Sequence, residues 1–80
     1  MKIKTLFFGI SKDIANESSS VLELNENATI HHLTRALMDK YPGFSSINEF
    51  SIALNEEYVE NDALLKENDV VAIIPPVSGG

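Results

Sequence analysis

The chain has 80 residues, of which 44% are hydrophobic and 22% charged. These proportions are typical of one globular domain, and the length leaves no room for a second. The net charge of −6, with six scattered Lys and Arg residues, argues against nucleic acid as a partner, because phosphates are bound by clustered basic side chains. The absence of cysteine excludes disulfides, thiolate metal sites and a catalytic thiol.

Residues 2–8, KIKTLFF, alternate between two faces and therefore predict a strand. A secretory signal also begins with charges followed by apolar residues, but here no long hydrophobic region or cleavage site follows. The apolar runs are too short to cross a bilayer, so we expect a cytoplasmic protein. The two faces of the strand are Ile3, Thr5 and Phe7 on one side and Lys2, Lys4, Leu6 and Phe8 on the other.

The next two segments predict a loop and a second strand. Residues 11–20, SKDIANESSS, are polar and rich in turn formers, which predicts a loop. Residues 21–24, VLEL, alternate again, with Leu22 and Leu24 on one face. We expect this short strand to form a hairpin with the first.

Residues 30–41, IHHLTRALMDKY, predict the main helix. Ile30, Leu33 and Leu37 recur at helical spacing, and Thr29 is a good N-cap. Pro42 ends the helix, because the residue before a proline avoids the α region. Adjacent histidines diverge on a helix and cannot share a metal ion, so we interpret His31 and His32 as surface residues.

Three further strands are expected after the helix. Residues 44–50 are irregular and allow one short helical turn, and residues 51–55, SIALN, predict a strand. Tyr58 and Val59 form a short edge segment within an acidic run, Glu56, Glu57, Glu60 and Asp62. That run fits a solvated turn and also fits a basic partner or weak cation binding. A turn at KEND precedes the last strand, residues 70–74.

This order of elements predicts an α+β fold, the β-grasp or ubiquitin-like fold, with a mixed sheet of four to five strands crossed by one main helix. The first and last strands are the most apolar on both faces, so we expect them to be adjacent and parallel near the centre of the sheet.

Three segments, LFFG, NEEYVEND and LLKENDVVAIIPPVSGG, resemble the small subunit of molybdopterin synthase, a ubiquitin-like sulfur carrier. The resemblance covers residues 1–80 as a single domain, and its most specific part is the Gly-Gly pair after a strand and two prolines. The family usually has Gly-Asp before the last strand, where this chain has Asn68-Asp69. Asn tolerates a positive φ, so we expect the turn to persist. Lys12, Asp13 and Asn16 stand where the family often has Arg-Glu and a glycine.

Residues 75–80 are expected to form an extended functional tail. Prolines favour extended geometry, and six residues reach about 20 Å. Glycines carry no side chain and pass through narrow channels. The resemblance implies that the tail enters the active site of a partner; its residues are Pro75, Pro76, Val77, Ser78, Gly79 and Gly80.

The resemblance also implies the chemistry of the tail. A separate enzyme, similar to ubiquitin-activating enzymes, would adenylate Gly80 with ATP, and a sulfur donor would convert the adenylate to a thiocarboxylate. The sulfur would pass to cyclic pyranopterin monophosphate in a large catalytic subunit, within a heterotetramer, to form the dithiolene of the molybdenum cofactor. The chain itself would bind no cofactor or metal and supply no catalytic side chain of its own.

Strand parity predicts the surface that meets the large subunit. Phe8, Tyr58 and Ile74 are expected on the sheet face away from the helix, and exposed aromatic and apolar side chains beside a functional tail indicate a partner interface. The alternative is that these three are ordinary core residues.

Other functions remain open at this level. The chain also fits a sulfur carrier for thiamine synthesis or tRNA thiolation, a ubiquitin-like protein modifier joined to lysines, and a purely structural interaction domain. A carrier gives a thiocarboxylate, whereas a modifier gives high-mass conjugates.

Overall fold

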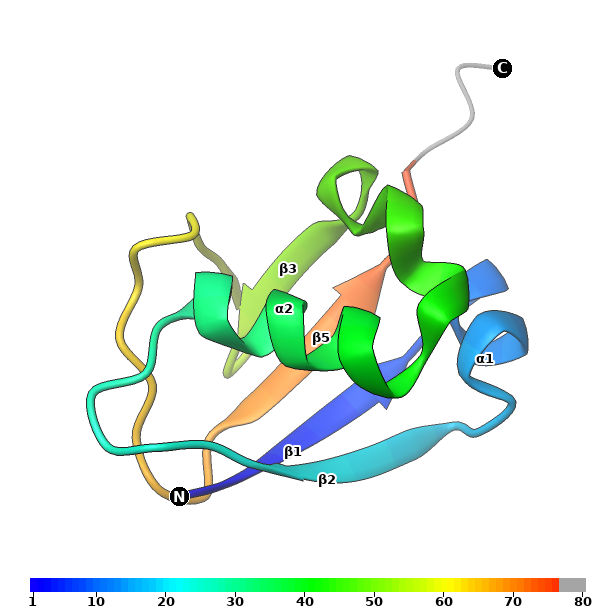
Figure 1. The fold of residues 1–80 in the computed structure, drawn as a ribbon. Coiled ribbons are helices and arrows are strands. Elements are labelled where there is room, and N and C mark those ends of the chain that lie inside the picture. The colour runs from blue at the N-terminus through cyan, green and yellow to red at the C-terminus, as the bar shows by residue number, and fades with distance from the viewer. Residues whose placement is uncertain (77–80) are drawn as a thin grey trace.

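The computed structural model describes residues 1–76, and these form one five-stranded sheet crossed by a helix (Figure 1). The predicted β-grasp fold is therefore confirmed. No helix within residues 1–76 is long and apolar enough to cross a membrane. The elements are β1 Lys2–Phe7, α1 Ile10–Ala15, β2 Ser19–Glu23, α2 Ile30–Lys40, the 3₁₀ segment η1 Pro42–Glu49, β3 Ser51–Leu54, β4 Glu57–Tyr58 and β5 Val70–Ile74.

The sheet has the strand order β2-β1-β5-β3-β4. β1 pairs antiparallel with β2 and parallel with β5, as predicted, and β5 pairs antiparallel with β3. Because the two central strands run in the same direction, the N-terminus and the start of the tail lie at opposite ends of the molecule (Figure 1).

The core lies between α2 and one face of the sheet. The alternation read from the sequence is confirmed, because all three residues of the first predicted face of β1 are buried, as are Val71 and Ile73 of β5. Leu33 and Leu37 of α2 and Phe44 of η1 are also fully buried. The second apolar face of β1 and β5 is only half covered, so central position in the sheet does not require burial on both sides.

Helix α2 begins and ends close to the predicted positions. The backbone N–H of Thr29 donates to His32 Nδ1 at 2.9 Å, which makes His32 the acceptor that Glu or Gln usually supplies in a capping box. The helix ends at Lys40, before Pro42. His31 and His32 are both exposed, and residues 1–76 contain no cluster of three or more His, Cys, Asp or Glu side chains arranged to hold a metal ion.

The loop predicted for residues 11–20 is wrong at both ends. Residues Ile10–Ala15 form α1, and β2 begins at Ser19 rather than Val21. The polar composition of this segment gave no sign that one face of it is buried. Ser11 and Ala15 are buried, and Ile14 packs against the core. A six-residue helix gains its stability from such packing rather than from intrinsic propensity.

Two turns, one after α1 and one before β5, each contain an asparagine in the left-handed backbone conformation. Helix α1 ends at Asn16, whose φ is 58°. Asn68 has a φ of 69°, which confirms that Asn replaces Gly in the turn before the last strand. The irregular segment expected after α2 is longer than one helical turn, because η1 spans eight residues with non-helical angles at Phe44 and Ser46.

Candidate functional site

The open face of the sheet is the face away from α2, and the register of the strands defines it. Leu6 pairs with Ala72, Ala72 with Ala53, and Ala53 with Tyr58. Directly paired residues place their side chains on the same face, so these four form a row across β1, β5, β3 and β4. No other layer of residues 1–76 covers this face.

A hollow of ≈ 420 Å³ lies in the middle of the open face. It forms because two alanines, Ala53 and Ala72, occupy adjacent central positions and leave the larger side chains around them as a rim. Asn55 closes one end and is held in place, since its Nδ2 donates to Asp69 Oδ1 at 3.0 Å and Val70 N–H donates to its Oδ1 at 3.0 Å. The lining residues are Leu6, Phe8, Ala53, Asn55, Glu56, Val70 and Ala72.

All three predicted interface residues lie on the open face. Phe8 is 49% exposed and lines the hollow. Ile74 is half-buried at the end of β5, paired with Ser51, one position beyond the Phe7–Ile73 pair and therefore level with Phe8. Tyr58 is 71% exposed on the edge strand β4 and lies outside the hollow. The alternative that these are ordinary core residues is wrong for Phe8 and Tyr58.

Sequence reasoning missed part of this surface. Leu6, Val70 and Ala72 share the parity of Phe8 and Ile74, so the alternation of β1 and β5 contained the signal for them. Ala53 and Asn55 join the surface only through the register between β3 and β5, which the sequence does not specify.

The tail leaves the body beside this face. Pro75 is half-buried against Gly9, and Pro76 is exposed. Gly9 follows Phe8 directly, so the start of the tail and an exposed aromatic side chain lie next to each other at one end of the sheet. The predicted tail residues Val77, Ser78, Gly79 and Gly80 lie outside the described residues.

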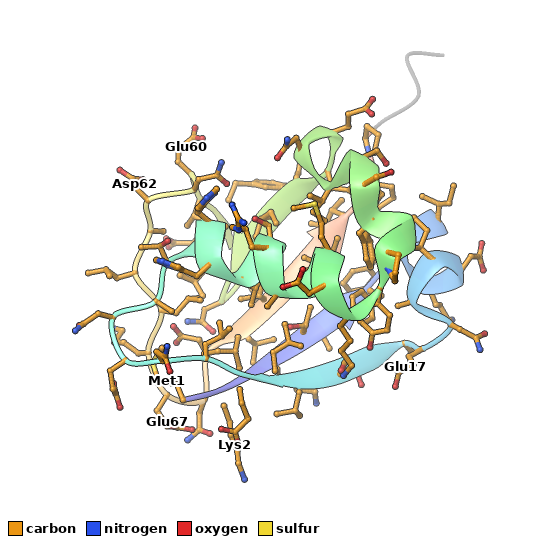
Figure 2. All side chains as sticks on the ribbon, viewed as in Figure 1. Met1, Lys2, Glu17, Glu60, Asp62 and Glu67 are labelled. Atoms are coloured by element: carbon orange, nitrogen blue, oxygen red, sulfur yellow. The ribbon has the colours of Figure 1, made fainter. Side chains whose placement is uncertain are left out.

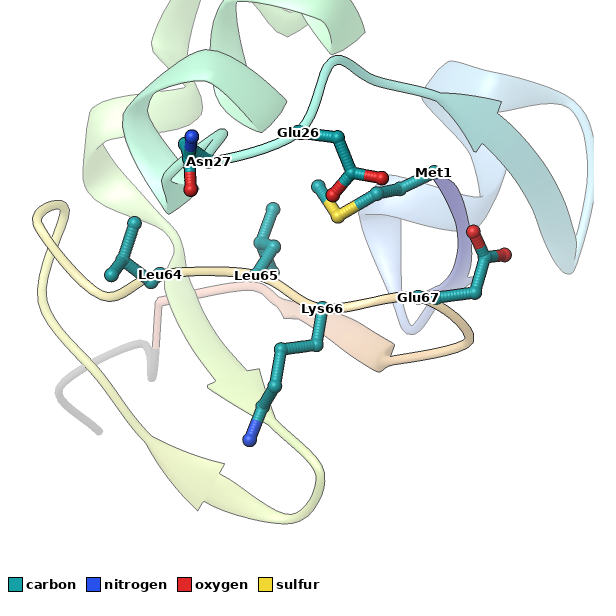
Figure 3. Close-up of a pocket in the computed structure, with 7 residues that line it drawn as sticks. All are labelled: Met1, Glu26, Asn27, Leu64, Leu65, Lys66 and Glu67. Atoms are coloured by element: carbon teal, nitrogen blue, oxygen red, sulfur yellow. The ribbon is translucent and has the colours of Figure 1, made fainter.

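A second pocket lies at the opposite end of the sheet (Figure 3). It has a volume of ≈ 450 Å³ and is formed by the first residue of the chain, the turn before α2 and the segment before β5. Its lining mixes Leu64 and Leu65 with charged side chains of Glu26, Lys66 and Glu67. Because this pocket lies at the opposite end of the sheet from the start of the tail, we do not include it in the candidate site.

The acidic run is a solvent-exposed feature. Glu56, Glu57, Glu60 and Asp62 are all exposed, and Figure 2 shows Glu60 and Asp62 projecting outward from the loop after β4. Their side chains make no hydrogen bond or ion pair within residues 1–76, in agreement with a solvated turn.

The chain is similar to known sulfur carriers. A model of the ThiS family matches residues 5–80. The molybdopterin synthase sulfur carrier subunit of Chlamydomonas reinhardtii is 37% identical over 83 residues, covering 100% of both chains. Among solved structures, the putative molybdopterin converting factor, subunit 1, of Pyrococcus furiosus has a TM-score of 0.89 at 28% identity, covering 96% of this chain and 99% of that one.

A second similar solved structure contains two different subunits. It is the complex of subunits 1 and 2 of the molybdopterin-converting factor of Helicobacter pylori, where the matched chain has a TM-score of 0.72 at 28% identity, with 100% of both chains covered. Together with the full-length curated relative, these matches agree with the geometry of a β-grasp domain that has an open apolar face beside its tail. The chain belongs to the ThiS family and is one of the molybdopterin synthase sulfur carrier subunits.

Proposed function

We propose that this protein carries sulfur as a thiocarboxylate on Gly80 and delivers it within a molybdopterin synthase complex. The observation that carries the proposal is the position of Pro75 and Pro76, which follow the end of β5 next to Gly9, beside Phe8 and the open face. A partner that covers the open face would therefore receive the tail at the same time. The Gly-Gly end supports the same function, because two residues without side chains fit a narrow channel.

The chemistry begins with activation of a poor electrophile. A carboxylate resists nucleophilic attack, so the Gly80 carboxylate would first attack ATP, forming an acyl-adenylate and releasing pyrophosphate. A persulfide would then displace AMP, and a thiol would reduce the resulting acyl disulfide to the thiocarboxylate and a mixed disulfide. Transfer of the sulfur to cyclic pyranopterin monophosphate would return the carboxylate, with its oxygen supplied by water.

The reacting side chains are assigned to the partners. The buried polar side chains of residues 1–76 are Thr5, Ser11, Thr34 and Asp69, and the last three form hydrogen bonds within the fold. We propose that an activating enzyme binds ATP, that a large subunit catalyses sulfur transfer, and that no cofactor or metal binds to this chain. The reducing cytoplasm suits both the thiocarboxylate and its persulfide donor.

The open face is the proposed contact with the large subunit. The Helicobacter pylori complex joins subunit 1 to subunit 2 and supports a two-subunit assembly for this chain. An exposed aromatic side chain next to an apolar hollow has the composition of an interface centre. The proposed assembly has two copies of each subunit, as a heterotetramer.

The carrier function is tested by the intact mass of the protein. After incubation with the host activating enzyme, ATP and a sulfur donor, the mass should rise by the replacement of one oxygen with sulfur. A variant without Gly80 is the control and should not change. An unmodified wild-type mass, with an activating enzyme shown to be active on another carrier, would contradict the proposal. High-mass conjugates in a lysate would instead indicate a protein modifier.

The interface is tested with the substitution Phe8→Ala. The expected result is a loss of about 2 kcal/mol in affinity for the large subunit, or roughly 30-fold in Kd, because truncation removes a central aromatic anchor. The unfolding temperature of the free subunit should barely move, since half of the side chain is already in water. Leu64→Ala is the matched control, because Leu64 is 60% exposed but lies in the loop at the far end of the sheet. Equal affinities for the two variants would contradict the interface.

A further inference from the structure

We propose that Gly9 and Ser11 are positioning residues that fix the direction in which the chain leaves the sheet at Pro75 and Pro76. This inference rests on the proposed function, because the direction of the tail matters only if Gly80 must reach a partner's active site. The two residues contact the chain at two nearby points, one at the end of β5 and one just beyond it. Ser11 holds Ile73, the last residue of the β1–β5 ladder, and Gly9 accommodates Pro75, two residues later.

Ser11 joins three segments through one buried hydroxyl. Its single Oγ–H donates to the carbonyl oxygen of Phe8 at 2.5 Å and, in a bifurcated bond, to the carbonyl oxygen of Ile73 at 3.2 Å. Ser11 itself is 0% exposed, and its contact with Ile73 is buried. Ile73 O also accepts the Phe8 N–H at 3.3 Å. The end of β1, the start of α1 and the end of β5 are thus tied together where the parallel pairing stops.

Gly9 provides the space that the first tail residue occupies. Its φ of +56° lies in the region that favours glycine. A Cβ added to it would lie 2.8 Å from Pro75 Cγ, a separation at which the ring has to move. The ring of Pro75 therefore packs directly on the backbone of Gly9. Because proline also fixes its own φ, this contact sets the orientation of the chain as it enters Pro76.

A small change of direction at Pro75 would displace the far end of an extended tail by a larger amount. Five residues follow Pro75, and an extended chain of that length reaches at most about 17 Å. A tilt of about 20° at the exit would move the end of such a chain by roughly 6 Å. Misplacement of a reacting atom by about 1 Å can already slow an enzymatic step by about 100-fold.

The functional test separates binding from transfer. Thiocarboxylate-loaded Ser11→Ala and Gly9→Ala would be compared with wild type for their Kd with the large subunit and for single-turnover sulfur transfer to cyclic pyranopterin monophosphate. We expect transfer at saturating large subunit to fall by at least about tenfold, with Kd changed by less than about twofold, because Ser11 is fully buried and Gly9 contributes no side chain to the open face. A wild-type protein that never forms a thiocarboxylate would instead refute the proposed function.

Matched controls make the same kinds of change elsewhere in the fold. Thr34→Val deletes a hydroxyl that donates to His31 O at 2.9 Å in α2, and Gly43→Ala adds a Cβ 3.0 Å from Ile14 Cγ2. Both should lose some stability and keep the wild-type transfer rate.

A direct measurement of the tail is independent of enzyme activity. The chain has no cysteine, so Asn48→Cys, at an exposed position of η1 close to β3, gives a single site for a nitroxide label. Paramagnetic relaxation of the Gly79 and Gly80 amides should differ between wild type and Ser11→Ala and stay unchanged in Thr34→Val. Unchanged relaxation and transfer in Ser11→Ala would overturn the inference, even if Gly9→Ala failed to fold.

Discussion

Thr5 is a buried hydroxyl whose replacement should stabilise the protein. It is 0% exposed on β1 in the centre of the sheet, and its Oγ1 finds no hydrogen-bond partner among the described residues. Its register neighbour on β5 is Val71, also 0% exposed. Two side chains of nearly the same shape therefore lie side by side in the core, and only one of them carries a polar atom.

The expected change in the free energy of unfolding follows from two effects of the substitution Thr5→Val. Removing an unsatisfied buried hydroxyl recovers about 1–3 kcal/mol of desolvation cost. The new methyl group adds buried apolar surface, and the fit of Val in the same space limits the gain from it. We expect the free energy of unfolding to rise by about 1–2 kcal/mol. For a domain of this size, each 1 kcal/mol corresponds to about 4–8 °C in Tm.

The assay is urea unfolding of the free subunit, with Val71→Thr as the matched control. Val71→Thr puts the hydroxyl on the neighbouring strand and should destabilise the domain by about 1–3 kcal/mol. The m-values of both variants should match wild type, because the surface exposed on unfolding is unchanged. A loss of 1 kcal/mol or more in Thr5→Val would refute the reasoning and indicate that Oγ1 has a partner such as a buried water.

Three further predictions concern local structure and are checked by the same unfolding measurement. Thr29→Ala should lose about 1 kcal/mol by removing the N-cap of α2, whereas Thr29→Ser should retain most of it. Asn68→Ala should lose about 1 kcal/mol because its φ is 69°, and Asn68→Gly should not; equal effects would show that the turn tolerates alanine. Asp69→Ala should lose about 2–3 kcal/mol, since its carboxylate accepts from Lys66 N–H at 2.7 Å and from Asn55, while exposed Asp62→Ala should have little effect.

The elements that could be predicted are those whose own residues show a periodic pattern of apolar side chains. Leu33 and Leu37 repeat at helical spacing, so α2 was evident from residues 30–41 alone. The alternation of Ile3, Thr5 and Phe7 identified both the strand and its buried face. Helix α1 could not be found in this way, because its six residues are stabilised by contacts with η1 and the core rather than by their own pattern.

The candidate site was predictable only in part for a related reason. Phe8 and Ile74 follow from the parity of their strands, and Pro75 to Gly80 stand out as a motif. The hollow depends on Ala53 meeting Ala72, and the exit of the tail depends on Gly9 meeting Pro75. These are contacts between distant segments, and a single sequence does not indicate which pairs of small residues will meet.

The parallel pairing of β1 with β5 has a consequence for how the molecule is made. Lys4 pairs with Val70, so the central ladder joins the first residues of the chain to nearly the last. The entropic cost of closing so long a loop precedes the contacts that compensate for it, which slows folding relative to a helical bundle of equal size. During synthesis, β1 and its hairpin partner β2 must wait without their central neighbour until β5 has emerged. A chain interrupted before residue 70 would lack the sheet's middle strand and would expose the core face of β1, a state that chaperones and proteases recognise. The native sheet can form only once β5 is present. The chain therefore folds completely only after synthesis has reached the strand that precedes the tail.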